Sequence, residues 1–331
     1  MRDGYAGRVW CLEKESSWFL FVRRDKEDRN ALFYSLHGLS AVLAVAVFTG
    51  TTAVAAPITL PVGPLFIQYT NDEQFSITNA IHSTDAATGA VTSEGNWGIL
   101  QISSIVKGTA QNPPGSDIQG GGANIFTDGG VGGHQITGIF YGTTVNPGGL
   151  SAHGGAIDLY WQDVGKANTG ADLAAFDPTR RLNQKTYTGY AEPLNPNFIF
   201  LAQLVFGPGC DSNPAHNVCT GVAPGTGDGT AKSYQSVNLA AGGLWASQLD
   251  SNFFTFDANG QPLVPAQDIR TDSNFSQNGA SGWNGGGDII GLRSNDPVRL
   301  EATPEPGTLS LFGLGLVGMG FLRRRKQNKQ K

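Results

Sequence analysis

The chain has 331 residues, of which 40% are apolar and 10% aromatic, enough to bury a sizeable core, which excludes a wholly disordered protein. Its 46 glycines and its low charged content of 15% are typical of a turn-rich β protein rather than a helical one. Residues 56–302 carry 9 basic and 20 acidic residues, a net charge of −11 (9 − 20), which disfavours a nucleic-acid partner and leaves cations, polysaccharide or solvent.

The first 55 residues predict a leader that contains a Sec-type signal peptide. Four basic residues between Arg23 and Arg29 precede an apolar run over residues 36–48, and Ala53 and Ala55 supply the small residues of a cleavage site. Cleavage after Ala55 would begin the mature chain at residue 56 and make the Sec translocon a partner. An uncleaved signal anchor is the alternative.

The exported region, residues 56–302, consists of short β-branched and aromatic runs separated by Gly, Asn, Asp and Pro, a pattern that predicts strands. We expect an antiparallel β-sandwich of the jelly-roll type with one or two short helices. The glycine runs at 120–122 and 129–133 are interpreted as loops. The expected helices lie at 72–81 and 172–176, and the expected strands at 97–105, 134–141, 156–161, 197–206, 253–256 and 288–292.

The exported region keeps two cysteines, Cys210 and Cys219, because Cys11 precedes the predicted cleavage site. The loop between them is short, and closing it with a disulfide in an oxidising compartment would stabilise the fold by roughly 2–3 kcal/mol. Metal binding is the alternative, but two thiols without a second Cys or His pair do not complete a zinc site. We therefore predict a disulfide and no metal site.

No pattern in the sequence predicts an enzyme. The histidines of the exported region have no paired spacing, although His153 and Asp158 could meet across a turn. A Gly-x-Ser-x-Gly elbow, a P-loop and a dinucleotide fingerprint are all missing from the sequence. We expect no catalytic residue and no cofactor. The histidines of the exported region are His82, His134, His153 and His216.

Three weaker alternatives remain open. A polysaccharide hydrolase needs two placed carboxylates, for which Glu94, Asp158 and Asp163 are the candidates. Tyr160 and Trp161 could stack on sugar rings, but alternation along a strand favours core packing for one of them. The stretch 257–260 resembles the start of a calcium loop without the Glu that such a loop requires, so calcium is the one cofactor left open.

The C-terminus, residues 303–331, has three parts. Pro304, Glu305 and Pro306 come first, and an uncharged apolar stretch at 308–322 follows. As a helix this stretch would span about 22 Å, short for a hydrocarbon core of about 30 Å, so we predict a single, marginal transmembrane helix. The chain then ends in a basic cluster that would stay on the cytoplasmic side of the membrane: Arg323, Arg324, Arg325 and Lys326.

This order of motif, apolar segment and basic cluster resembles the PEP-CTERM sorting signal. The resemblance implies that Pro304, Glu305 and Pro306 are recognised by exosortase, a membrane protease and transpeptidase of Gram-negative bacteria that often make exopolysaccharide. It also implies export through the inner membrane, transient membrane anchoring, and final location at the cell surface or outside the cell. A looser resemblance to uncharacterised PEP-CTERM proteins, through stretches such as 97–100 and 294–297, implies no activity.

Together these observations predict a non-enzymatic protein of the cell surface or extracellular matrix, structural or adhesive, and associated with exopolysaccharide or biofilm. The alternatives are an extracellular carbohydrate-binding module and a polysaccharide-active hydrolase. The predicted domains are the leader at 1–55, the exported β domain at 56–302 and the sorting signal at 303–331.

Overall fold

The computed structural model describes residues 57–84, 91–128, 134–163, 198–277 and 279–304. The predicted signal peptide, the helix at 172–176, the glycine run at 129–133, and the apolar and basic parts of the C-terminus lie outside these residues. Among the described residues no helix has the length and apolarity needed to cross a bilayer.

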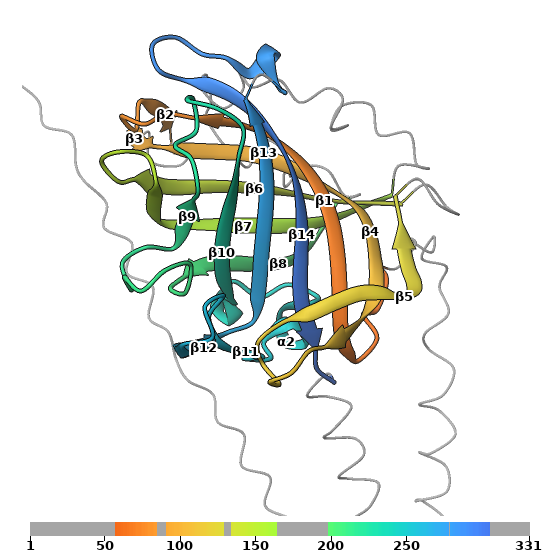
Figure 1. Ribbon diagram of the computed structural model, residues 1–331. Coiled ribbons are helices and arrows are strands. Elements are labelled where there is room, and N and C mark those ends of the chain that lie inside the picture. The colour runs from red at the N-terminus through yellow and green to blue at the C-terminus, as the bar shows by residue number, and fades with distance from the viewer. Residues whose placement is uncertain (1–56, 85–90, 129–133, 164–197, 278, 305–331) are drawn as a thin grey trace, which may run out of the picture. The chain divides into compact units, whose positions relative to one another are not determined.

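The described chain is mainly β (Figure 1). It contains two 3₁₀ turns, η3 (Leu239–Ala241) and η4 (Ser281–Trp283), and one short helix, α2 (Ala246–Leu249). The strands are β1 (Gly63–Phe75), β2 (Ile81–Thr84), β3 (Val91–Glu94), β4 (Asn96–Ala110), β5 (Ile118–Thr127), β6 (His134–Val145), β7 (Ser151–Asp163), β8 (Phe198–Gly207), β9 (Val218–Thr220), β10 (Gly229–Val237), β11 (Phe254–Phe256), β12 (Pro262–Gln267), β13 (Ile269–Gln277) and β14 (Ile290–Ala302).

Eight of these strands form a closed antiparallel barrel, so the expected β-sandwich is wrong. The order around the wall is β1-β14-β13-β10-β8-β7-β6-β4, and β4 pairs back with β1 (Figure 1). Closure depends on β4, which pairs with β1 along one edge and with β6 and then β5 along the other. Inward and outward residues alternate in a sandwich and in a barrel alike, so alternation does not distinguish the two.

All six strands expected from the sequence are present, in β4, β6, β7, β8, β11 and β14. Two other expectations are wrong. Residues 72–81 end β1, form a turn and begin β2 instead of forming a helix, and 120–122 lie inside β5 instead of in a loop. Glycine is required at Gly120 because a Cβ there would lie 2.7 Å from the ring of Phe66.

One end of the barrel interior is filled by apolar side chains and covered by the segment that carries α2. Trp245 and Leu249 of this segment are buried in the main core together with Leu60, and the Trp245 indole donates to the carbonyl of Ile58 at 3.0 Å. Strand β14 finishes at this plugged end with the buried Ala302.

A second apolar cluster packs Trp97 on β4 against Ile81 and against Trp283 in the connection between β13 and β14. Gln74 joins the two tryptophans: Trp97 Nε1 donates to its Oε1 at 2.7 Å, and its Nε2 donates to the Trp283 carbonyl at 2.8 Å. The same connection is held by Asp288, which accepts the backbone N–H of the turn after β1 at 2.9 Å. This cluster packs the chain segments outside the barrel against the wall.

Candidate functional site

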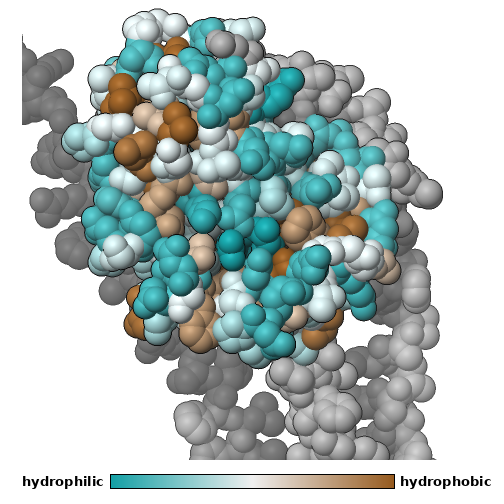
Figure 2. All heavy atoms as spheres, viewed as in Figure 1, coloured by the Kyte–Doolittle hydropathy of each residue, from teal (hydrophilic) through white to brown (hydrophobic). Residues whose placement is uncertain are grey.

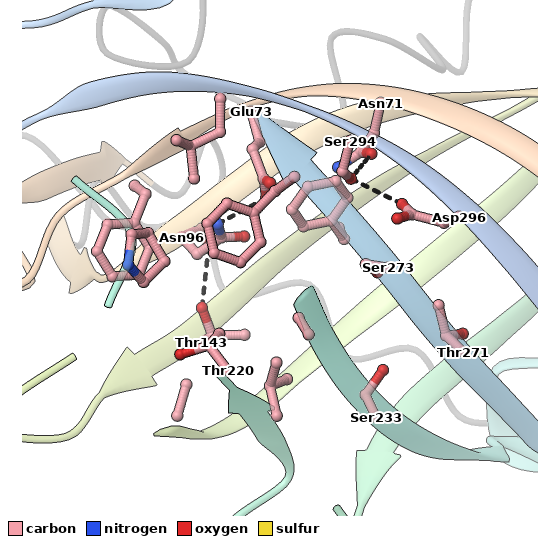
Figure 3. Close-up of a pocket in the computed structure, with 18 of the residues that line it drawn as sticks. Asn71, Glu73, Asn96, Thr143, Thr220, Ser233, Thr271, Ser273, Ser294 and Asp296 are labelled. Atoms are coloured by element: carbon pink, nitrogen blue, oxygen red, sulfur yellow. Dashed lines mark hydrogen bonds between the residues drawn. The ribbon is translucent and has the colours of Figure 1, made fainter. Parts of the chain in front are cut away.

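The barrel interior contains a cavity of about 100 Å³ in the half away from the plugged end, and Figure 3 shows its polar lining. A water molecule needs roughly 10–15 Å³ of such space, so the cavity has room for several waters or one small molecule. Hydroxyl, amide and carboxyl groups come from β1, β4, β10, β13 and β14, and phenylalanine rings line the rest. Ser273 and Thr220 in its wall are partly exposed.

Glu73 lies in this cavity because β1 alternates, which turns Tyr69, Asn71, Glu73 and Phe75 inward. Its Oε2 accepts a hydrogen bond from Asn96 Nδ2 at 2.7 Å. Burial raises the pKa of Glu73 to about 8; the Asn96 bond opposes that rise, and the negative charges of Asp296 and Asp72 add to it. The group therefore retains its proton near neutral pH.

Asp296 is the second carboxyl group of the cavity and is 2% exposed. Its Oδ2 accepts from Ser294 Oγ at 2.8 Å and, with the Asn71 amide turned to satisfy both its ends, from Asn71 Nδ2 at 2.8 Å. Its Oδ1 is buried without a hydrogen-bond partner among the described residues. Burial raises the pKa of Asp296 to about 7, against the effect of the hydroxyls of Ser273, Ser294 and Tyr69.

The cavity is acidic with no compensating base among the described residues that line it. Its titratable groups are Glu73, Asp296 and Tyr69, and no Lys, Arg or His side chain contributes. Burial, followed by the charges of Asp296 and Glu73, raises the pKa of the Tyr69 phenol well above its usual value. Buried carboxylates are ordinarily paired with a cation, which makes this lining unusual for a mere structural core.

The disulfide predicted from the sequence anchors a short strand of the cavity wall. Strand β8 pairs with β10 only along one half, and in the other half the short strand β9 lies between β10 and β7. Val218 and Thr220 of β9 line the cavity, whereas Cys219 is bonded to Cys210 after β8, with 5.5 Å between their Cα atoms. The prediction of this disulfide is confirmed, and the bond holds a cavity-lining strand in place.

A family model described as the PEP-CTERM protein-sorting motif matches residues 302–326. The chain therefore carries a PEP-CTERM sorting signal at its C-terminal end. The motif implies export and exosortase as the processing partner. No curated protein and no solved structure matches the chain. The sorting motif is thus the part of this PEP-CTERM protein that comparison identifies.

The sorting motif begins where the barrel wall ends. Ala302, the first residue matched, is the last residue of β14. Thr303 is still fixed to the plugged end, because its N–H donates to the Gln248 carbonyl at 2.7 Å and its hydroxyl to the Ser247 carbonyl at 3.2 Å. Pro304 therefore follows the folded barrel almost without a linker, at the end opposite to the cavity.

Glu94 and Asp158, two of the three carboxylates that the sequence suggested for a hydrolase, do not line the cavity. Glu94 accepts the backbone N–H of Gly142 at 2.6 Å. Asp158 accepts from the Tyr141 hydroxyl at 3.0 Å and from Gln203 at 2.9 Å, and its pKa is raised, chiefly by burial. The side chain of Asp163 lies outside the described part of the structure.

The suggested meeting of His153 with Asp158 is wrong. Both residues lie on β7, five positions apart, which is about 16 Å along a strand. The Nδ1 atom of His153 lies 3.0 Å from Asn146 Oδ1 instead. Of the other histidines, His216 has its Nδ1 2.7 Å from Asp211 Oδ2.

The residues that the sequence suggested for sugar stacking and for calcium binding pack in the core or stabilise a turn. Trp161 is 1% exposed in the main core, and Tyr160 packs against the ring of Phe200 at 5.5 Å. Asp257 Oδ1 accepts the N–H groups of Asn259 and Gln261, both at 2.8 Å, in the turn between β11 and β12. This carboxylate thus stabilises a hairpin turn.

Sequence reasoning missed Glu73 and Asp296, the two acidic groups of the cavity. The signal that could have found Glu73 is the alternation begun by Leu65 and Ile67, which continues through Tyr69 and places Glu73 on the inner face. The stretch of Asp, Glu and Gln that includes Glu73 predicts a helix instead, which obscures the two-residue alternation of the strand. No local sequence pattern indicates that Asp296, more than 200 residues later in the chain, lines the same cavity.

Proposed function

We propose that this exported PEP-CTERM protein binds one small molecule inside its barrel and displays that binding site at the cell surface or outside the cell. The observation that supports this proposal is the cavity in one half of the barrel, with its polar and unpaired acidic lining. Eight-stranded barrels have an interior that side chains just fill or that holds one small ligand. Here the plugged half is filled by side chains, and the other half is left for a ligand.

The position of the sorting motif suits this function. The motif starts from the plugged end, so a protein held through its C-terminus would turn the half with the cavity away from that attachment. The face shown in Figure 2 is largely hydrophilic, with apolar residues in small separate groups. This face offers no broad apolar surface for adhesion, and we propose a non-catalytic, ligand-binding role.

Processing at the sorting motif should shorten the chain without weakening the barrel. We expect a lower mass in cells with exosortase than in cells without it, because the motif implies exosortase as the processing partner. Intact mass measurement would locate the new C-terminus, and the variant with Pro304, Glu305 and Pro306 all changed to Ala should stay full length. Denaturation midpoints should agree, since β14 and Thr303 precede Pro304, Glu305 and Pro306. Equal full-length masses in both strains would contradict the proposal.

Filling the cavity should abolish binding. Ser273→Phe places a ring in the cavity, whereas Asn274→Phe adds the same ring to the neighbouring, exposed position of β13. We expect a melting screen with small neutral, cationic and anionic organic molecules to give stabilising compounds for the wild type and Asn274→Phe. Ser273→Phe should respond to none of them. If it responds as the wild type does, or if no compound stabilises any form, the cavity is not a binding site.

A further inference from the structure

We infer that the molecule bound in the barrel is a small organic cation, with an ammonium group beside Glu73 and Asp296 and an apolar arm against the phenylalanine rings. This inference rests on the proposed function and specifies its ligand. It is carried by three features of the cavity: an acidic pair without a base, a buried oxygen without a partner, and an aromatic lining.

The charges of the lining favour a cation. Glu73 and Asp296 come from β1 and β14, and Tyr69 completes the titratable groups that face them; Asp72, the acid next to Glu73 in the chain, is paired with Arg293 at 2.7 Å. An anionic ligand would find no basic side chain among the described lining residues. An ammonium ligand would supply the missing cation and donate several hydrogen bonds to the two carboxylates.

The unpartnered oxygen gives the ammonium group a definite position. Asp296 Oδ1 is buried and has no hydrogen-bond partner of good geometry among the described residues, although the Tyr69 and Ser273 hydroxyls lie near enough to the carboxyl group to lower its pKa; Oδ2 is already engaged by Ser294. A buried acceptor without a partner costs about 1–3 kcal/mol, and more when it is charged. A ligand N–H directed at Oδ1 would remove that cost.

The aromatic lining favours an organic cation over a metal ion. Phe75, Phe140, Phe206 and Phe275 line the cavity with Tyr69, and aromatic faces attract ammonium groups as well as apolar arms. The one cluster of potential metal ligands among the described residues is Cys210, Asp211 and Cys219, which does not include Glu73 or Asp296.

Cation binding should be coupled to proton release. Below about pH 7 the raised pKa values, about 8 for Glu73 and about 7 for Asp296, keep protons on both groups, so the incoming ammonium group binds as a carboxyl proton leaves to the buffer. Affinity for a cation should therefore rise with pH until both groups are ionised, whereas affinity for a neutral molecule should not.

The test uses three probes of one shape: phenethylammonium, its neutral isostere 2-phenylethanol, and the anion phenylacetate. Titration calorimetry of the full chain at pH 6.0 and 8.5 should show that phenethylammonium binds best, and at least about tenfold more tightly at pH 8.5. Its binding enthalpy at pH 6.0 should differ between phosphate and MES, two buffers that take up the released proton with different enthalpies. Asp296→Asn should weaken phenethylammonium at least about tenfold more than it weakens 2-phenylethanol.

Asp158→Asn is the matched control, because Asp158 is also a buried carboxyl group but does not line the cavity; it should leave the affinity for phenethylammonium unchanged. Tighter binding of 2-phenylethanol or phenylacetate would contradict the inference that the ligand is a cation. It would still agree with the proposal that the cavity binds a small molecule. Failure of phenethylammonium to bind also overturns the cation inference, and the response of Ser273→Phe in the melting screen then decides whether the cavity binds anything.

Discussion

Raising the pH from 5 to 8 should destabilise the ligand-free barrel by at least about 3 kcal/mol. Glu73 and Asp296 have pKa values raised to about 8 and about 7 in the folded state, so between these values and their unfolded pKa values near 4 the native protein holds more protons. Stability falls with rising pH wherever the native state binds more protons. The loss should thus begin above about pH 4 and end above about pH 8.

Urea denaturation at pH 5 and pH 8 measures this effect. The double variant Glu73→Gln, Asp296→Asn keeps the hydrogen-bonding shape without the ionisation, so its pH slope should be much smaller than that of the wild type. Asp228→Asn, which removes an exposed carboxylate, should keep the wild-type slope. A wild-type stability that is flat or rises between pH 5 and pH 8 would show that the cavity acids ionise normally.

The second large effect should come from Trp97→Ala, at about 3–5 kcal/mol. Trp97 is 0% exposed and packs against the ring of Trp283 with 5.3 Å between centroids. Its loss would leave a large gap between the wall and the segments outside it, and Gln74 Oε1 would lose the 2.7 Å hydrogen bond that it accepts. The denaturation midpoint should fall while the slope with denaturant stays constant.

Trp97→Phe separates packing from hydrogen bonding at this position. It keeps a ring in the cluster but removes the indole N–H, so it should cost about 1–3 kcal/mol, the cost of leaving the buried Gln74 acceptor unpaired. Proteolysis should cut the β13–β14 connection faster in Trp97→Ala than in Trp97→Phe, since Trp283 holds that connection. Equal stability of Trp97→Ala and the wild type would exclude the proposed role of the outer cluster.

The strands were readable from the sequence where β-branched and aromatic residues alternate without interruption. Residues 156–161 have that pattern, whereas 97–105 and 197–206 are apolar-rich runs, and the described residues of all three lie in strands of the barrel. The prediction of a helix at 72–81 was wrong, because polar residues there line the inside of a barrel instead of its outside. Polar side chains on an inner face reverse the usual rule that apolar residues mark the core, so their strand was interpreted as a helix.

The sequence by itself determined the sorting motif of this protein, which implies export, and the Cys210–Cys219 crosslink. Motif order at the C-terminus and the spacing of Cys210 and Cys219 are local features, which need no knowledge of distant contacts. Only the tertiary structure decided that the wall closes through β4 pairing with β1, and that Glu73 and Asp296 meet inside it. Closure and cavity both depend on which strands become neighbours, and strand neighbours can be separated by most of the chain.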